Sequence, residues 1–138
     1  MRYLIDTNIF LFFALNPALL DRKVLAIITN VENRVYLSSE CVKEVIHLVQ
    51  VGRVRSKLWK TADDIFSFIE KETDFTISYV KKEHLLTLAG LALVSGHNDP
   101  SDRLIIAQAI TEKVPLISSD AKFAHYENQR LNFIFNKK

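Results

Sequence analysis

The chain has 138 residues, the length of one ordinary domain, and we expect a single domain over 1–138. Its apolar share of 49% and charged share of 25% are typical of a globular protein, and its net charge of +2 is too small to identify a nucleic-acid-binding protein by itself. No apolar run approaches the roughly 20 residues that cross a bilayer, and the single cysteine, Cys41, excludes an internal disulfide, so we expect a cytoplasmic protein with no membrane segment.

Short apolar runs bounded by polar or turn-forming residues predict five β-strands. In chain order, these strands cover residues 3–5, 34–37, 75–80, 114–117 and 131–135. Segments whose apolar residues recur at helical spacing separate the strands. In chain order, the predicted helices lie over residues 9–14, 24–31, 42–49, 65–69, 81–94 and 100–109.

Polar residues and turn formers mark the ends of several predicted helices. Asp21, Ser38 and Asp99 stand directly before helical segments, where their side-chain oxygens can accept hydrogen bonds from free amide groups. Pro17 stops the first helix and Gly52 stops the third. Strands that alternate with helices imply right-handed crossovers and a sheet covered on both faces. The predicted fold class is therefore α/β, with three α/β/α layers and a mainly parallel sheet of about five strands.

The stretch over residues 98–109 holds two carboxylates at the start of an apolar helix. Pro100 suits the first helical position, so Asp99 becomes the N-cap and Asp102 takes the third helical position. The rest of the helix is almost wholly apolar, which predicts that it packs against the sheet. Capping alone also accounts for two acids at a helix start, and this explanation stays open.

Five acids are expected at one edge of the sheet, where open parallel sheets bind their ligands beyond the carboxyl ends of the strands. Two follow predicted strands, two begin the helix just described, and one lies early in the helix after the second strand. They are Asp6, Glu44, Asp99, Asp102 and Asp120. Capping would also explain Asp6 and Asp120 taken singly. Spacing does not choose Glu44 over Glu40.

Carboxylates that converge in this way repel one another, and a hard divalent cation relieves the repulsion. Mg²⁺ or Mn²⁺ is the expected metal. Such a site suits phosphodiester hydrolysis, because the metal lowers the pKa of a bound water and stabilises the attacking and leaving oxygens. The four histidines lack metal-binding spacing, which argues against zinc, and the three glycines form no phosphate-binding loop. No serine or cysteine has a recognisable base nearby, which argues against a covalent nucleophile.

Four segments together resemble, in order, the motifs of PIN-domain ribonucleases, and most closely those of VapC-type toxins of bacterial toxin–antitoxin pairs. The segments are residues 3–8, 39–44, 99–109 and 116–120, and the likeness extends from Tyr3 to about Phe123. The Asp-Pro-x-Asp-Arg block at Asp99 with its apolar helix is the most specific of them. The Asp-Thr-Asn start is weak on its own.

The resemblance implies roles for individual residues by position. Asp6 matches the first metal-binding aspartate of the family, Glu44 its glutamate, Asp102 its third acid and Asp120 its fourth. The residues that match supporting positions are Thr7, Asp99, Arg103 and Ser118. Of these, Asp99 matches an acid of one subgroup and is expected to be a cap. Arg103 either pairs with an acid or contacts the substrate, and the sequence does not decide.

The resemblance implies a Mg²⁺- or Mn²⁺-dependent endoribonuclease that a bound antitoxin silences. It also implies a homodimer, with the apolar side of the early helices as one contact surface. One departure supports an alternative, a catalytically inactive PIN module that binds RNA or a protein partner. In the nearest subgroup, the glutamate often follows a tryptophan and precedes a lysine by four residues. Here Lys43 and Leu48 occupy those positions.

A run of basic residues provides candidate contacts to the RNA backbone. It consists of Arg53, Arg55, Lys57 and Lys60, with no acid among them. As a group they would contribute a salt-dependent attraction for phosphates. The alternative is an ordinary solvated surface. Trp59, within this run, is either a base-stacking platform or a packed side chain.

Overall fold

Strand β1 (Arg2–Ile5) occupies the centre of a five-stranded sheet in the computed structural model, which describes residues 1–138. The strand order is β3-β2-β1-β4-β5, and every neighbouring pair is parallel. The other strands are β2 (Arg34–Ser38), β3 (Thr76–Ser78), β4 (Leu116–Ser118) and β5 (Phe133–Phe135). The predicted five-stranded parallel sheet is confirmed.

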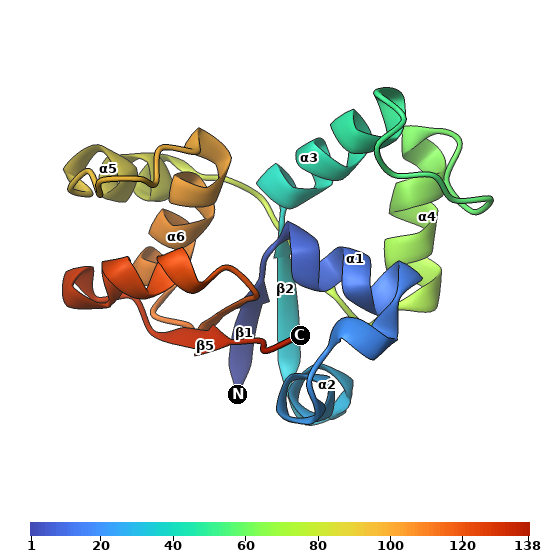
Figure 1. The fold of residues 1–138 in the computed structure, drawn as a ribbon, viewed down its shortest axis with the longest axis horizontal. Helices are drawn as coiled ribbons and strands as arrows, with labels where there is room; N and C mark the ends of the chain where they lie inside the picture. Colours follow the sequence, from blue (N-terminus) through green and yellow to red (C-terminus); the bar gives the residue numbers. More distant parts are fainter.

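Helices cover both faces of the sheet (Figure 1). Those on one side are α1 (Thr7–Leu15), α2 (Arg22–Thr29), α3 (Ser39–Gln50) and α4 (Ala62–Glu72). Those on the other side are α5 (Lys82–Gly90) and α6 (Pro100–Glu112). Two 3₁₀ helices complete the fold, η1 (Pro17–Leu19) and η2 (Ala121–Gln129). The three-layer α/β/α arrangement is thus confirmed, and none of the helices combines the length and the apolar character needed to cross a bilayer.

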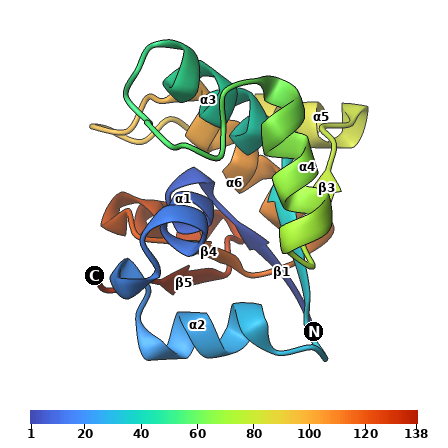
Figure 2. The ribbon, with the colours of Figure 1, turned by 90° about the vertical axis from the view of Figure 1, so that its right-hand side faces the viewer.

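The two ends of the sheet differ in what surrounds them. In Figure 2, α3 and α5 lie at one end of the molecule and α2 lies at the opposite end, near the N-terminus. Because all strands run in the same direction, the end near α3 is where their carboxyl ends emerge. This end is therefore the place for a ligand site in an α/β fold.

Helix starts follow the predicted caps. The side chains of Asp21, Ser38 and Asp99 accept hydrogen bonds from the backbone N–H groups of Val24, Glu40 and Asp102, respectively. Each cap satisfies an amide that has no partner within its helix, which stabilises a helix by about 1 kcal/mol.

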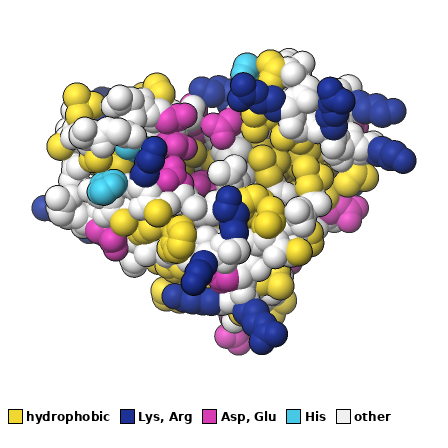
Figure 3. All heavy atoms as spheres, viewed as in Figure 1, with side chains coloured by type: hydrophobic (Ala, Val, Ile, Leu, Met, Phe, Trp, Pro, Cys, Tyr) yellow, Lys and Arg dark blue, Asp and Glu magenta, His cyan; other side chains and the backbone are white.

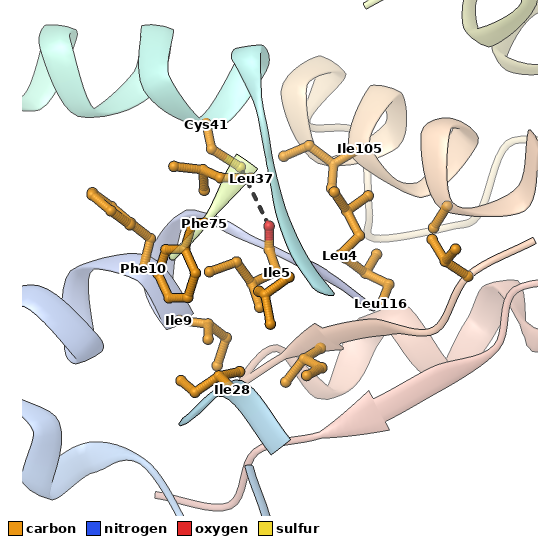
Figure 4. Packing of buried hydrophobic residues seen from close by; sticks show 14 of the residues in the cluster. Leu4, Ile5, Ile9, Phe10, Ile28, Leu37, Cys41, Phe75, Ile105 and Leu116 are labelled. Atoms are coloured by element: carbon orange, nitrogen blue, oxygen red, sulfur yellow. Dashed lines mark hydrogen bonds between the residues drawn. The ribbon is translucent and has the colours of Figure 1, made fainter. Parts of the chain in front are cut away.

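The core joins the sheet to both helical layers. Figure 4 shows Ile5 of β1 facing Ile9 and Phe10 of α1, while the Sγ of Cys41 lies 3.8 Å from the carbonyl oxygen of Ile5. Phe10 also stacks on Trp59, with ring centroids 5.8 Å apart and planes 8° apart. Trp59 is fully packed in the core, so its packing role is the correct interpretation and it is no base-stacking platform.

A buried amide fixes α6 against the ends of two strands. Gln108 of α6 hydrogen-bonds through its Oε1 with the hydroxyl of Ser38, the last residue of β2. Its Nε2 donates to the carbonyl oxygen of Ser78, the last residue of β3, at 3.2 Å. Gln108 and Ser38 are wholly buried, so these bonds compete with little water.

The structure departs from the predicted elements in the segments before and after α6. The helix predicted over 81–94 ends at Gly90. Arg103 causes this early end, because its guanidinium donates to the carbonyl oxygens of Leu91 and Ala92 at 2.9 Å and 3.2 Å and holds them out of helical geometry. The strand predicted over 75–80 is reduced to Thr76–Ser78, and the 3₁₀ helix η2 lies where no element was predicted.

Candidate functional site

The carboxyl ends of β1 and β4 meet at the point where the strand order reverses. The chain leaves β1 toward β2 and β3, then crosses back to β4 on the other side of β1. Asp6 directly follows β1, and Asp120 lies two residues beyond the end of β4. The backbone N–H of Asp6 donates to the carbonyl oxygen of Ile117 at 3.2 Å, which ties the two strand ends together.

Asp6 is a buried carboxylate, only 5% exposed. Its side chain caps α1 by accepting from the N–H of Ile9 at 3.0 Å, and it also accepts from the hydroxyl of Ser118. Burial raises the pKa of Asp6 from 3.8 to about 6, against the lowering effect of these two hydrogen bonds. The negative charges of Glu44 and Asp120 raise this pKa further.

Asp102 faces the same acids from the first turn of α6. It occupies the third helical position, as predicted, and its side chain is 26% exposed. Its pKa is raised from 3.8 to about 7, first by burial and then by the charges of Asp99, Asp6, Glu44 and Asp120. The structure therefore brings all five predicted acids into one electrostatic cluster, although they come from four separate segments. We call these residues, Asp6, Glu44, Asp99, Asp102 and Asp120, the acidic cluster.

The structure also distinguishes Glu44 from Glu40, a choice that the spacing of the sequence does not make. Glu40 pairs with Lys43 and accepts a hydrogen bond from the hydroxyl of Ser101 at 3.0 Å, so its charge is already compensated. Glu44 forms no ion pair, and it is the acid of α3 whose charge raises the pKa values of Asp6 and Asp102. Glu44 is the member of α3 that belongs to the acidic cluster.

Of the two small hydroxyl residues predicted to support the acids, Ser118 contacts them and Thr7 does not. Ser118 is wholly buried; its Oγ accepts from the N–H of Asp120 at 3.0 Å and its hydroxyl donates to Asp6. Thr7 is also buried, and its hydroxyl interacts with the thiol of Cys41. Ser118 therefore links the acids that follow β1 and β4 through a single side chain.

The remaining supporting residues have structural contacts. Asp99 is exposed and caps α6 through the N–H of Asp102 at 3.0 Å, which confirms its predicted cap role. Arg103 is buried, and besides the two loop carbonyls it donates to the Oη of Tyr126 at 3.3 Å. No acid is among these contacts, so the predicted pairing of Arg103 with an acid is not found.

His97 lies beside the acidic cluster, although the spacing of the four histidines in the sequence argues against a role in metal binding. Its Nε2 is 3.4 Å from an Oδ of Asp102, and its Nδ1 is 2.7 Å from the Oη of Tyr126. Burial lowers the pKa of His97, an effect that the charges of Asp120 and Asp99 partly oppose. No sequence spacing signals this contact, because His97 reaches Asp102 through an irregular loop rather than along a helix.

The donor set fits a divalent cation. Two of the acids have pKa values raised toward neutrality, and none of the cluster's carboxylates forms an ion pair with a lysine or arginine. One potential ligand atom each from His97, Asp102 and Asp120 lies within 4.8 Å of the others, a spread that one ion can bridge. A cation bound beside Asp6 and Asp102 would favour the ionised forms of these two carboxylates, whose pKa values are raised in its absence.

The basic run lies away from the acids. Arg53, Arg55, Lys57 and Lys60 are exposed in the segment that joins α3 to α4. The last three line a surface groove of about 530 Å³. The acidic cluster lies at the opposite end of α3, whose 12 residues span about 18 Å. Figure 3 shows both features on one face, with acidic side chains between α3 and α6 and basic ones around the far end of α3.

Solved structures with the same architecture share low sequence identity with this chain. VapBC2 from Rickettsia felis, bound to a DNA fragment from its promoter, matches with a TM-score of 0.70 and 20% identity, over 99% of this chain and 100% of that chain. VapBC-1 from nontypeable Haemophilus influenzae matches with a TM-score of 0.67 and 16% identity, over 98% of each chain. VapBC-5 from Mycobacterium tuberculosis, a member of the VapBC family of toxin–antitoxin systems, matches with a TM-score of 0.59 and 20% identity, over 99% of this chain and 98% of that chain.

The comparison of sequences gives a more direct result. No curated protein matches the chain at a significant level. The profile of the PIN domain family, in contrast, matches residues 3–129, which includes every strand except β5 and the whole acidic cluster. The chain therefore belongs to the PIN domain family.

Proposed function

We propose that this chain is a metal-dependent endoribonuclease that hydrolyses RNA phosphodiester bonds with Mg²⁺ or Mn²⁺. One observation carries the proposal: burial and neighbouring acids raise the pKa values of Asp6 and Asp102 toward neutrality, and neither carboxylate forms an ion pair with a lysine or arginine. The metal ligands proposed are Asp6, Asp102 and Asp120. A cation bound there supplies Lewis-acid stabilisation of the phosphate and lowers the pKa of an attacking water.

The residues of the chain have separate tasks in this proposal. Asp6 is held rigidly by its hydrogen bonds to Ile9 and Ser118, so its carboxylate does not need to reorient when a ligand arrives. Glu44 is half-buried at the edge of the cluster, where its carboxylate can accept a proton from the attacking water. The start of α6 places the positive end of a helix dipole beside the phosphate position.

RNA would extend from the acidic cluster along α3 to the basic run. Both features lie on one face, and the exposed cations along the groove can neutralise backbone phosphates (Figure 3). An RNA strand bound both at the acidic cluster and at the basic run, about 18 Å apart, would be oriented on the protein as well as attracted to it. The basic run would therefore strengthen RNA binding without taking part in the hydrolysis.

We also propose that the chain is the toxin of a toxin–antitoxin pair. Among the similar structures, VapBC-5 is a member of a family of toxin–antitoxin systems, and VapBC2 is bound to a DNA fragment from its promoter. Figure 3 shows apolar side chains gathered on the surface between α1, α3 and α4, a surface suited to an antitoxin segment. Half-buried apolar residues of these helices include Leu11, Phe12, Ile46, Val49 and Phe66. The homodimer implied by the resemblance remains a prediction, which sedimentation of the purified chain tests.

The experiment that tests the proposal is RNA cleavage by the purified chain with Mg²⁺, with Mn²⁺ and with a chelator. We expect cleavage only with metal, and a 5′-phosphate on the product. Asp6→Asn and Asp102→Asn should abolish cleavage while circular dichroism shows a retained fold. Asp63→Asn, which alters an exposed acid at the start of α4, is the matched control and should cleave normally.

Full activity in either site variant would refute the assignment. RNA binding without cleavage under any divalent metal would instead favour the inactive PIN module.

A further inference from the structure

His97 presents an unpartnered nitrogen to the acidic cluster. The residue is 4% exposed, and its Nε2 has no hydrogen-bond partner. That nitrogen lies 3.4 Å from an Oδ of Asp102, and an oxygen of Asp120 lies within 4.8 Å of the same group of atoms. A buried polar atom without a partner is unfavourable, so this arrangement calls for a ligand between the nitrogen and the carboxylates.

The opposite side of the ring indicates which nitrogen carries the proton. Arg103 can only donate, so the Oη of Tyr126 accepts from it at 3.3 Å. The same Oη lies 3.5 Å from the carbonyl oxygen of His97, to which it donates, and 2.7 Å from Nδ1. All three contacts of the Tyr126 hydroxyl are hydrogen bonds when Nδ1 carries a proton and donates it to Oη. Nε2 then carries a lone pair, which agrees with its lack of a hydrogen bond to Asp102.

We propose that Nε2 of His97 is a direct ligand of the metal ion bound by Asp102 and Asp120, and that the site therefore prefers Mn²⁺ and other transition-metal ions to Mg²⁺. This inference rests on the proposed metal-dependent function and adds a nitrogen ligand to its three carboxylates. Imidazole is a good ligand for transition metals, whereas Mg²⁺ strongly prefers oxygen. The hydrogen bond from Nδ1 to Tyr126 fixes the ring in the orientation for ligation, as usual for ligating histidines.

The observed separation agrees with shared coordination. Two ligand atoms at about 2.1 Å from one ion lie about 3.0 to 3.4 Å apart when the angle between them is between a right angle and the tetrahedral value. Nε2 and the Asp102 oxygen are separated by 3.4 Å. No other histidine competes for this role, since the ring of His84 bonds to Lys81 and Glu112 and the side chains of His47 and His125 are exposed.

The test is electron paramagnetic resonance of Mn²⁺ bound to the full chain, with detection of the hyperfine coupling of a bound nitrogen. We expect imidazole coupling in the unaltered protein and in the control His125→Gln, and its loss in His97→Gln. Isothermal titration should show that His97→Gln weakens Mn²⁺ binding by about 10-fold or more, with a smaller effect on Mg²⁺. Neither readout depends on RNA cleavage.

The outcomes separate the two proposals. Mn²⁺ that binds without imidazole coupling overturns the role of His97 and leaves the nuclease proposal in place; His97 would then only orient Asp102. Failure of any divalent ion to bind overturns both. If His97→Gln does not fold, the spectra of the unaltered protein, His47→Gln and His125→Gln are compared instead. Imidazole coupling that persists in both variants comes from neither of the two exposed rings and supports ligation by His97. Coupling that is lost in either variant overturns the proposal.

Discussion

The backbone N–H of Asp6 donates to the carbonyl oxygen of Ile117 at 3.2 Å, one residue beyond the end of β1. The pairing of β1 with β4 therefore continues up to the first acid of the cluster. Asp6 and Asp120 are brought together by the sheet itself, before any metal binds. Because the sheet fixes their positions, the repulsion between these acids should lower the stability of the metal-free protein, which is the basis of the first two predictions.

The metal-free protein should become less stable as the pH rises from about 4 to about 8. The pKa of Asp6 is raised from 3.8 to about 6 and that of Asp102 from 3.8 to about 7, so the folded state holds protons that the unfolded state has already released. The stabilisation is complete below pH 3.8 and is lost as the pH rises through 6 and 7. In EDTA, we expect the free energy of unfolding to be about 2 to 4 kcal/mol lower at pH 8 than at pH 5. Urea denaturation measures this difference, and saturating Mn²⁺ should remove most of it. If the free energy of unfolding depends on pH equally in EDTA and in Mn²⁺, the prediction is contradicted.

Asp102→Asn should stabilise the metal-free protein and abolish its response to metal. Replacing this carboxylate with a neutral amide removes one charge from the repelling set, which we expect to add about 1 to 3 kcal/mol at pH 8 in EDTA. The same change removes a proposed ligand, so Mn²⁺ should no longer raise the melting temperature. Differential scanning calorimetry with and without Mn²⁺ measures both effects. Asp63→Asn serves again as control, and a variant that is destabilised in EDTA would show that the acids do not repel.

Ser118→Ala should raise the pKa of Asp6 further. The hydroxyl of Ser118 favours the ionised form of Asp6, and its removal leaves burial and neighbouring charges to act without that compensation. Carbon-13 NMR titration of the aspartate carboxyl groups in EDTA should place the midpoint for Asp6 above about 6. The rise in cleavage rate on the acidic side of the pH profile should move to higher pH together with this midpoint. Ser119→Ala, at the half-buried neighbouring position, should leave the midpoint unchanged; an unchanged midpoint in both variants would exclude the role of Ser118.

The pair of substitutions Arg55→Gln and Lys57→Gln should weaken RNA binding and flatten its salt dependence. Each lost phosphate contact on a single strand reduces the magnitude of the negative slope of log K against log salt by about 0.7. The slope of the double variant should therefore be smaller in magnitude by about 1.4. Mn²⁺ affinity should stay the same, because these residues lie at the far end of α3 from the acidic cluster. Fluorescence anisotropy at several salt concentrations measures the slope. Lys23→Gln with Lys71→Gln is the charge-matched control, and an equal effect in the control would show that only net charge matters.

The sequence predicts the scaffold of the site well because its signals are local. Asp99 with Pro100 marks the start of α6, and the apolar run before Asp6 marks a buried strand, so the positions of these acids follow from short stretches of sequence. The parallel sheet follows from the alternation of strands and helices. The meeting of the acids at one edge then follows from topology.

What the sequence does not predict depends on contacts between distant residues. His97 reaches Asp102 because Arg103 holds the carbonyl oxygens of Leu91 and Ala92 and bends the chain away from α5. A local pattern over 81–94 still favours a helix, but it ends at Gly90, where the buried guanidinium of Arg103 and the amide of Gln129 bind the backbone that follows. The choice of Glu44 over Glu40 has the same origin, since it depends on Ser101 of another helix.

The amide of Gln108 also determines where the acids lie, because it fixes α6 relative to the sheet. By joining the ends of β2 and β3 to α6, it prevents the helix from sliding along the sheet, and the position of Asp102 relative to Asp6 depends on that register. We expect a chain that lost this one side chain to keep every acid in its sequence and yet to hold them at an altered spacing. Inactive forms of this fold can therefore arise by substitutions deep in the interior, and an intact acidic motif is not sufficient to recognise a working member.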